Sequence, residues 1–258
     1  LTPKLFMSTK GDEIFDKLES CWNDAEQAFL QLNDFIKNEL RLYSDKVIRS
    51  YNSLIPIFEY FYYHPHPTPD IREKMKTYYY SSQFFNWYSS KTDQILNSCH
   101  KIIVNEKSNN FPLNKLRNHF ENMGKKIYLT DNNLDMRLRY IILNLIYVQV
   151  FNNSPFNVGY KGNEPHIDHI YPKSKLKEYA TYDINHIGNY RFCGATDNIR
   201  KRAEGPDSYF KRLKDAGVKI ENHLLVADYA DHPELLIKDN YIDFRDKRHK
   251  RILEICED

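Results

Sequence analysis

Apolar residues in the first 150 positions recur mostly at intervals of three and four, the spacing that places them on one face of an α-helix. The longest example spans residues 12–38 and has these apolar positions: Ile14, Leu18, Cys21, Trp22, Ala25, Phe29, Leu32 and Ile36. Similar patterns predict helices over 53–63 (with Pro56 near a helix start or a kink), 70–80, 81–88, 93–104 and 113–123. Residues 134–151 are apolar nearly all round, so we expect a helix buried at the centre of a bundle.

The pattern changes at residues 152–155, Asn-Asn-Ser-Pro, which form a turn-rich hinge. Short extended runs follow at 165–171 and 190–193, a helix is expected to begin at 196–198, and another amphipathic helix covers 240–257. The predicted fold is mainly α. An N-terminal α-helical domain over 1–150 precedes a small ββα domain over 151–258, which a C-terminal helix closes.

Charge changes this picture only locally. The 258 residues carry a net charge of +2, which is not the global excess typical of a nucleic-acid-binding protein. Residues 1–60 have seven Lys/Arg against ten Asp/Glu, whereas 161–219 have twelve against eight. Any basic surface is therefore expected in the second half of the chain.

Cysteines and hydropathy restrict the compartment. Cys21, Cys99, Cys193 and Cys256 lie far apart without CxxC spacing, which excludes a standard zinc finger and gives no disulfide framework. No run approaches the roughly 18 apolar residues of a membrane span, and no signal peptide is recognisable. We expect a cytoplasmic protein without a membrane partner. Because the chain begins without Met, we also expect it to be part of a longer protein.

Candidate chemistry is concentrated between residues 166 and 202. A predicted strand ends in Asp168-His169, a second follows Asn189, and a helix carries Asn198 in its first turn, so the three elements enclose one polar cleft. The oxygens of Asp168 and Asn198 suit Mg²⁺, which retains several waters. His169, with an ordinary pKa of about 6.5, can accept a proton from water. Asn189 can bond to backbone across the loop and hold the shape that aims His169.

Strand geometry leaves alternatives open. Neighbouring strand residues face opposite sides, so Asp168 and His169 share a cleft only if the strand ends or twists there, and Pro172 is consistent with such an ending. His166 alternates onto the face of Asp168 and could contact metal or phosphate, although a structural hydrogen bond explains it equally well. On its own, a His-Asp-His string is no more than an even indication of catalysis.

The order Asp-His-Ile-x-Pro, Gly-Asn and Asn-x-x-Lys, which runs from Asp168 to Lys201, resembles the HNH (His-Me finger, ββα-metal) endonuclease family. Ile-Gly-Asn at 187–189, and less specifically Ser-Leu-Ile-Pro at 53–56 and Trp-Tyr-Ser-Ser at 87–90, are similar to GmrSD/SspE-like modification-dependent, type IV restriction-like defence proteins. The resemblance implies that Asp168 and Asn198 bind one Mg²⁺ or Mn²⁺ ion. It also implies that His169 is the general base and Asn189 the structural Asn.

The resemblance further implies partners. The substrate would be DNA, and the sensor domain that hydrolyses nucleotides in this family has no counterpart in the sequence. We therefore expect the chain to be the C-terminal portion of a longer protein, with residues 1–150 as the scaffold between sensor and nuclease.

Five basic residues flank the expected cleft and are predicted to bind DNA phosphates, although a solvated helix face is the simpler alternative: Lys173, Lys175, Arg200, Lys201 and Arg202. Consecutive helical positions lie about 100° apart, so at most two of residues 200–202 can face the cleft. We favour Lys201, because the family pattern has a Lys three residues after the last ligand.

The expected function is metal-dependent nicking or cleavage of DNA in antiviral defence. A nuclease-derived binding module without catalysis is one alternative, which the complete Asp168, His169 and Asn198 set disfavours. An RNA-cleaving toxin is another, which the sequence does not separate from a DNase.

Overall fold

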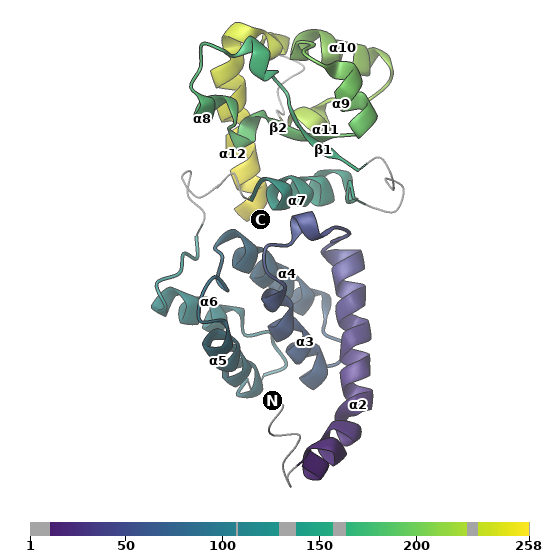
Figure 1. The fold of residues 1–258 in the computed structure, drawn as a ribbon, viewed down its shortest axis with the longest axis vertical. Coiled ribbons are helices and arrows are strands. Elements are labelled where there is room, and N and C mark those ends of the chain that lie inside the picture. Colours follow the sequence, from purple (N-terminus) through teal and green to yellow (C-terminus); the bar gives the residue numbers. More distant parts are fainter. Residues whose placement is uncertain (1–10, 107, 129–137, 157–163, 226–231, 258) are drawn as a thin grey trace. The chain divides into compact units, whose positions relative to one another are not determined.

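The computed structural model describes residues 11–106, 108–128, 138–156, 164–225 and 232–257 of the chain. Over these ranges the protein is mainly helical, with one small two-stranded antiparallel sheet (Figure 1). This confirms the mainly-α prediction. Within the same ranges, none of the helices combines the length and the apolar character needed to cross a membrane.

The chain forms two compact units. The first comprises residues 1–40 and 50–127, and the second comprises 41–49 and 128–258. Helix α7, Arg139–Phe151, therefore lies in the second unit, whereas its sequence pattern placed it within the N-terminal helical domain. It packs against the C-terminal helix α12, Tyr241–Glu257, and against strand β2, Tyr190–Cys193. Its residues from Ile141 to Ile146, all apolar except Asn144, are buried.

The first unit is built from helices in the positions that periodicity predicted. These are α2 (Gly11–Asp34, followed by a π-helical turn, Phe35–Glu39), α3 (Leu54–Tyr63), α4 (Pro69–Phe84), α5 (Thr92–Val104) and α6 (Leu113–Asn122). A separate helix over 81–88 is wrong, because residues 81–84 continue α4 and the chain then turns, with a positive φ of 51° at Asn86. Trp87 leaves this turn into the core, where its ring stacks on Phe120 at 4.2 Å between centroids.

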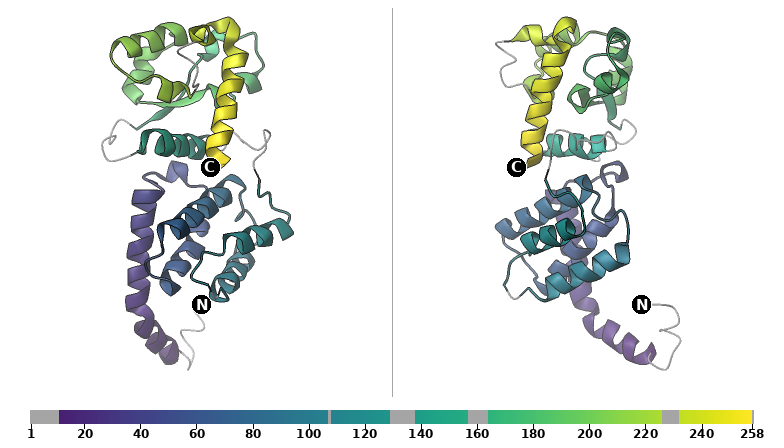
Figure 2. Two further views of the ribbon diagram at one scale, coloured as in Figure 1. Left: turned by 180° about the vertical axis from the view of Figure 1, so that it is seen from behind. Right: turned by 90° about the vertical axis from the view of Figure 1, so that its left-hand side faces the viewer.

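The second unit contains the sheet and most of the short helices. Strand β1, His166–His169, pairs with β2 so that Asp168 lies opposite Arg191 and His169 opposite Tyr190. The remaining elements are α8 (Thr181–Ile184), α9 (Ala195–Lys201), α10 (Pro206–Asp215), α11 (Glu221–Leu224) and α12, with short 3₁₀ turns between them. Both figures show α7 lying across α12, at the yellow end of the colour scale, near the C-terminal end of α12 (Figures 1 and 2).

Side chains from these elements form a hydrophobic cluster, centred on residues that follow β1 and on α10 and α12. Its buried members are Ile170, Tyr171, Leu176, Tyr209, Phe210, Ile220, Leu224, Leu235, Leu236, Tyr241 and Phe244. Because this cluster begins directly after His169, it fixes the end of β1 in space and with it the polar residues that β1 carries.

Candidate active site at the end of strand β1

A pocket of about 300 Å³ opens where β1 ends. Its lining residues are Ile167, Asp168, His169, Pro172, Lys173, Ser174, Asn198, Arg202 and Ala203. The three residues with the clearest candidate chemistry, Asp168, His169 and Asn198, therefore share one cavity. Neighbours on a strand can do so here because His169 is the last residue of β1.

Asp168 is buried in a network of charges. Its Oδ2 atom accepts from Nε of Arg191 at 3.0 Å and from Nζ of Lys201 at 2.7 Å. The three side chains are only 8%, 3% and 1% exposed, respectively. Arg191 reaches the carboxylate because it lies directly opposite on β2, and cross-strand partners extend from the same face of the sheet.

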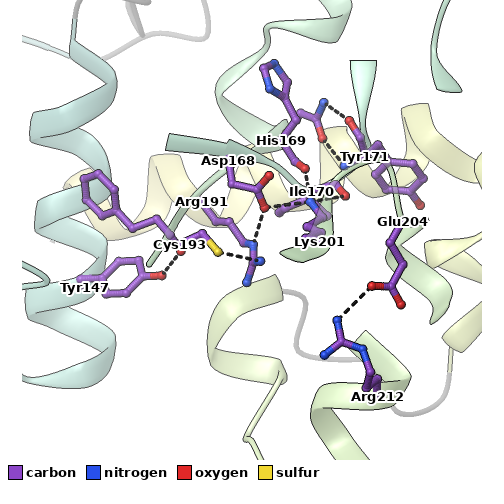
Figure 3. A network of polar contacts seen from close by, with 12 residues as sticks. Tyr147, Asp168, His169, Ile170, Tyr171, Arg191, Cys193, Lys201, Glu204 and Arg212 are labelled. Atoms are coloured by element: carbon purple, nitrogen blue, oxygen red, sulfur yellow. Dashed lines mark hydrogen bonds and ion pairs between the residues drawn. The ribbon is translucent and has the colours of Figure 1, made fainter. Parts of the chain in front are cut away.

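Lys201 reaches the same carboxylate from helix α9. It lies three residues after Asn198, so the two side chains share one side of the helix. Its ammonium also donates to the carbonyl oxygens of His169 and Ile170, which places it between the carboxylate and the end of the strand (Figure 3). Burial lowers the pKa of Lys201, and the charge of Asp168 opposes that shift.

The donor atoms fit a hard divalent ion that keeps most of its waters. Both ion pairs of Asp168 fall on Oδ2, and within the described ranges no hydrogen bond reaches Oδ1. That oxygen and the carboxamide oxygen of Asn198 are two candidate ligands at the same pocket. Mg²⁺ commonly takes only one or two protein carboxylates or carbonyls and completes its shell with water and substrate. A cage of three or more His, Cys, Asp or Glu does not occur in the described part of the chain.

His169 is oriented by a residue that the sequence analysis did not identify. Its Nε2 atom lies 3.1 Å from Oδ1 of Asn185, which also accepts from the hydroxyl of Tyr190 at 3.2 Å. Because a carboxamide oxygen only accepts, Nε2 carries the hydrogen and Nδ1 has the free lone pair. In Figure 3 the imidazole extends away from the ammonium of Lys201, toward which the carbonyl oxygen of His169 points.

The environment of His169 corrects the assumption of an ordinary imidazole. Burial lowers its pKa to about 4, and the nearby charge of Lys173 acts in the same direction, while the bond to Asn185 opposes the shift. The side chain is therefore neutral at pH 7. It is ready to accept a proton but is a weaker base than an exposed histidine.

Asn189 makes the backbone bonds expected from its position after the loop. It is fully buried, and its Oδ1 atom accepts from the backbone N–H of Tyr171 at 2.8 Å. Its Nδ2 atom donates to the carbonyl oxygens of Tyr171, at 3.2 Å, and Ile184, at 3.0 Å. These bonds tie the loop before β2 to the segment after β1. Asn189 thus fixes the end of β1 and does not line the pocket itself.

The remaining predicted residues divide into three groups. Lys173 and Arg202 line the pocket with exposed side chains, so both can meet an anionic substrate. The exposed side chains of Lys175, Arg200 and His166 are outside the lining, so the structure does not bring His166 together with Asp168. Lys201 is 1% exposed. The choice of Lys201 as the main DNA contact is therefore wrong in this structure, because its amine is bound internally to Asp168.

The chain matches no protein-family model, and a search of curated proteins finds no match. What the pocket can do must therefore be worked out from its own side chains. Two of the residues that shape it, Arg191 and Asn185, were missed in the sequence. Arg191 could have been suspected as a basic residue in the second predicted strand, but only the register of the two strands shows that it lies opposite Asp168. We find no comparable signal for Asn185.

Proposed function

We propose that this chain is a metal-dependent HNH-type endonuclease that nicks or cleaves DNA, in defence against foreign DNA. The observation that carries the proposal is the pocket at the end of β1. Asp168, His169 and Asn198 line it together, and they occur in the order of the HNH motif. The geometry supports phosphodiester hydrolysis, and the assignment to defence rests on the resemblance to GmrSD/SspE-like proteins.

The charge around the pocket favours an anionic substrate. Among the lining residues that the structure describes, Asp168 is the one carboxylate, whereas Lys173 and Arg202 line the opening with positive charge. Behind the carboxylate, Arg191 and Lys201 add two buried cations within hydrogen-bond distance. Positive charges around the pocket outnumber its carboxylate, so the site attracts phosphates, and a bound phosphodiester would add the negative charge that a divalent ion also needs.

The side chains can be assigned roles on this basis. Asp168 and Asn198 would hold the divalent ion, which when bound neutralises phosphate charge and lowers the pKa of a coordinated water. His169 accepts a proton at Nδ1, and the negative charge of a bound phosphate raises its pKa from the low value in the free protein. Lys173 and Arg202 bind the phosphate backbone and orient it.

A nicking assay tests the proposal. Supercoiled plasmid is incubated with the protein in Mg²⁺, in Mn²⁺ or in EDTA, in parallel with a structured RNA of similar length. We expect metal-dependent nicking that His169→Ala reduces by at least about a hundredfold, in the range expected for a general base. His166→Ala is the matched control, since His166 is an exposed histidine on the same strand outside the pocket.

Three outcomes would count against the proposal. Full nicking by a folded His169→Ala protein would show that His169 is not the general base. Equal nicking in EDTA would show that the reaction needs no metal ion. Cleavage of the RNA with the plasmid left intact would replace the DNase with an RNA-cleaving enzyme at the same site.

A further inference from the structure

Helix α2 carries an apolar stripe that stays largely exposed in the described part of the first unit, although one edge of Phe29 packs on Phe58 of α3. Its members are Leu18, Trp22, Ala25 and Phe29, and we call this set the α2 stripe. Leu18 is 36% exposed, Trp22 65% and Phe29 61%. The intervals of four, three and four residues follow the heptad repeat of a coiled-coil seam. Large apolar side chains that are contiguous and exposed mark interaction sites in soluble proteins.

The two sides of the α2 stripe differ. On one side, α2 packs against α3: Ala28 is 1% exposed, and the rings of Phe29 and Phe58 approach to 4.5 Å between centroids. On the other side, Glu19 and Glu26 are exposed and seven residues apart, each directly after an apolar position of the seam. The whole helix contains seven Asp/Glu and one Lys.

We propose that the α2 stripe is the docking surface for an amphipathic helix of another protein. The partner helix has an apolar seam of heptad spacing and carries Lys or Arg seven residues apart on the flank that faces Glu19 and Glu26. In coiled coils, charges at these flanking positions decide which helices pair. The proposal is independent of the nuclease function, because it uses only residues of α2 and α3.

Charge and packing argue against the two simplest other occupants. In an antiparallel pair of two α2 helices, Glu19 and Glu26 would face the same residues of the second copy. In a parallel pair, they would need the side of the second α2 that its own α3 occupies. An anionic membrane surface repels a helix with this excess of carboxylates, since helices that lie on membranes carry Lys and Arg beside the apolar face.

Two synthetic peptides of four heptads provide the probe. Both have Leu at the seam positions, and the flanking positions are Lys in one peptide and Glu in the other. Trp22 reports binding directly, because burial of an exposed indole shifts its fluorescence to shorter wavelength. The other tryptophan, Trp87, is already fully buried and contributes a constant background. We expect the Lys peptide to bind about tenfold or more tightly than the Glu peptide, which corresponds to about 1.4 kcal/mol.

Variants locate the binding and test the charge rule. Phe29→Ala should weaken binding of the Lys peptide by about tenfold or more, and circular dichroism checks that α2 remains folded. Val104→Ala is the matched control, because Val104 is an exposed apolar residue on α5 in the same unit. Glu19→Lys together with Glu26→Lys should reverse the preference and select the Glu peptide.

Three results would overturn the proposal. In one, both peptides bind equally well or neither binds at millimolar concentration. In another, the double charge reversal leaves the preference unchanged. In the last, sedimentation shows that the protein dimerises and that Trp22→Ala restores the monomer, in which case a second copy occupies the α2 stripe.

Discussion

Replacing Asp168 with Ala is expected to destabilise the second unit by about 3–5 kcal/mol, apart from any effect on catalysis. The substitution leaves Arg191 and Lys201 without their shared carboxylate, although their side chains are only 3% and 1% exposed. A buried cation that loses its partner retains the full desolvation penalty, and this is why breaking a buried ion pair is so destabilising. Asp168→Asn should behave similarly, because it keeps the shape but removes the charge.

A matched control comes from the same unit. Glu204 and Arg212 form an ion pair at 2.9 Å, but their side chains are 28% and 56% exposed. Water screens such a pair, so Glu204→Ala should change the free energy of unfolding by about 0–1 kcal/mol. Comparing the changes in the free energy of unfolding of the two variants separates the effect of burial from that of removing a charge.

The measurement must report on the second unit. Both tryptophans, Trp22 and Trp87, belong to the first unit, so intrinsic fluorescence does not follow unfolding around Asp168. Native-state hydrogen exchange, read by mass spectrometry on peptides that cover β1 and β2, gives a local free energy of opening. We expect Asp168→Ala to lower this value by several kcal/mol and to leave exchange in α5 unchanged.

A loss below about 1 kcal/mol, equal to that of Glu204→Ala, would refute the reasoning, because the carboxylate would then not be compensating two buried cations. The prediction also affects how activity data are interpreted. An inactive Asp168→Ala protein would not by itself identify a metal ligand, since a destabilised β1 displaces His169 as well. His169→Ala is therefore the more direct test of catalysis.

Three further predictions concern packing, pH and substrate binding. Gly188→Ala should destabilise the second unit by about 1–3 kcal/mol in the same exchange measurement, because a Cβ would lie 2.4 Å from the backbone oxygen of Arg245. Burial lowers the pKa of His223 from near 6.5 to about 4, so its contribution to stability is complete above pH 6.5 and is lost as the pH falls toward 4, by up to about 3 kcal/mol. In urea titrations followed by circular dichroism, the free energy of unfolding should therefore fall less between pH 6.5 and pH 4 in His223→Gln than in the unchanged protein. An equal fall in both proteins would contradict this. Lys173→Ala and Arg202→Ala should each reduce the salt dependence of duplex binding in EDTA by about one unit of slope, and no change in either variant would place the DNA elsewhere.

Local pattern was sufficient for much of the fold. The apolar spacing predicted a helix over 93–104, and α5 is Thr92–Val104, while the extended run 190–193 is the observed β2. The local pattern did not predict which elements pack against one another, because this depends on tertiary contacts. Helix α7 has no polar face, which shows that it is buried but not in which unit. Helix α10 was missed because its apolar residues are few, although Gly205-Pro206-Asp207 is a typical helix start.

The sequence predicted several of the residues that line the site, but not which charged residues pair with Asp168. The helical spacing expected for residues 200–202 holds only for Arg200 and Lys201, because α9 ends at Lys201 and Arg202 follows it with a positive φ of 48°. Within α9 it places Lys201 on the side of Asn198. Whether that side is solvent or protein depends on where β1 ends, which the sequence does not show. The same holds for Arg191: its charge is visible in the sequence, but only the strand register places it opposite Asp168.

The segment 164–202 depends on α12 for its conformation, because α12 binds the short turn at Ile187–Asn189. Arg248, 1% exposed, donates to the carbonyl oxygens of Ile187 at 3.3 Å and Gly188 at 3.1 Å. Burial lowers the pKa of Arg248 to about 9, so this guanidinium is retained in the interior at a large desolvation cost. The turn that it holds carries Asn189, which in turn fixes the end of β1. The position of His169 therefore depends on a helix that begins more than seventy residues later, at Tyr241.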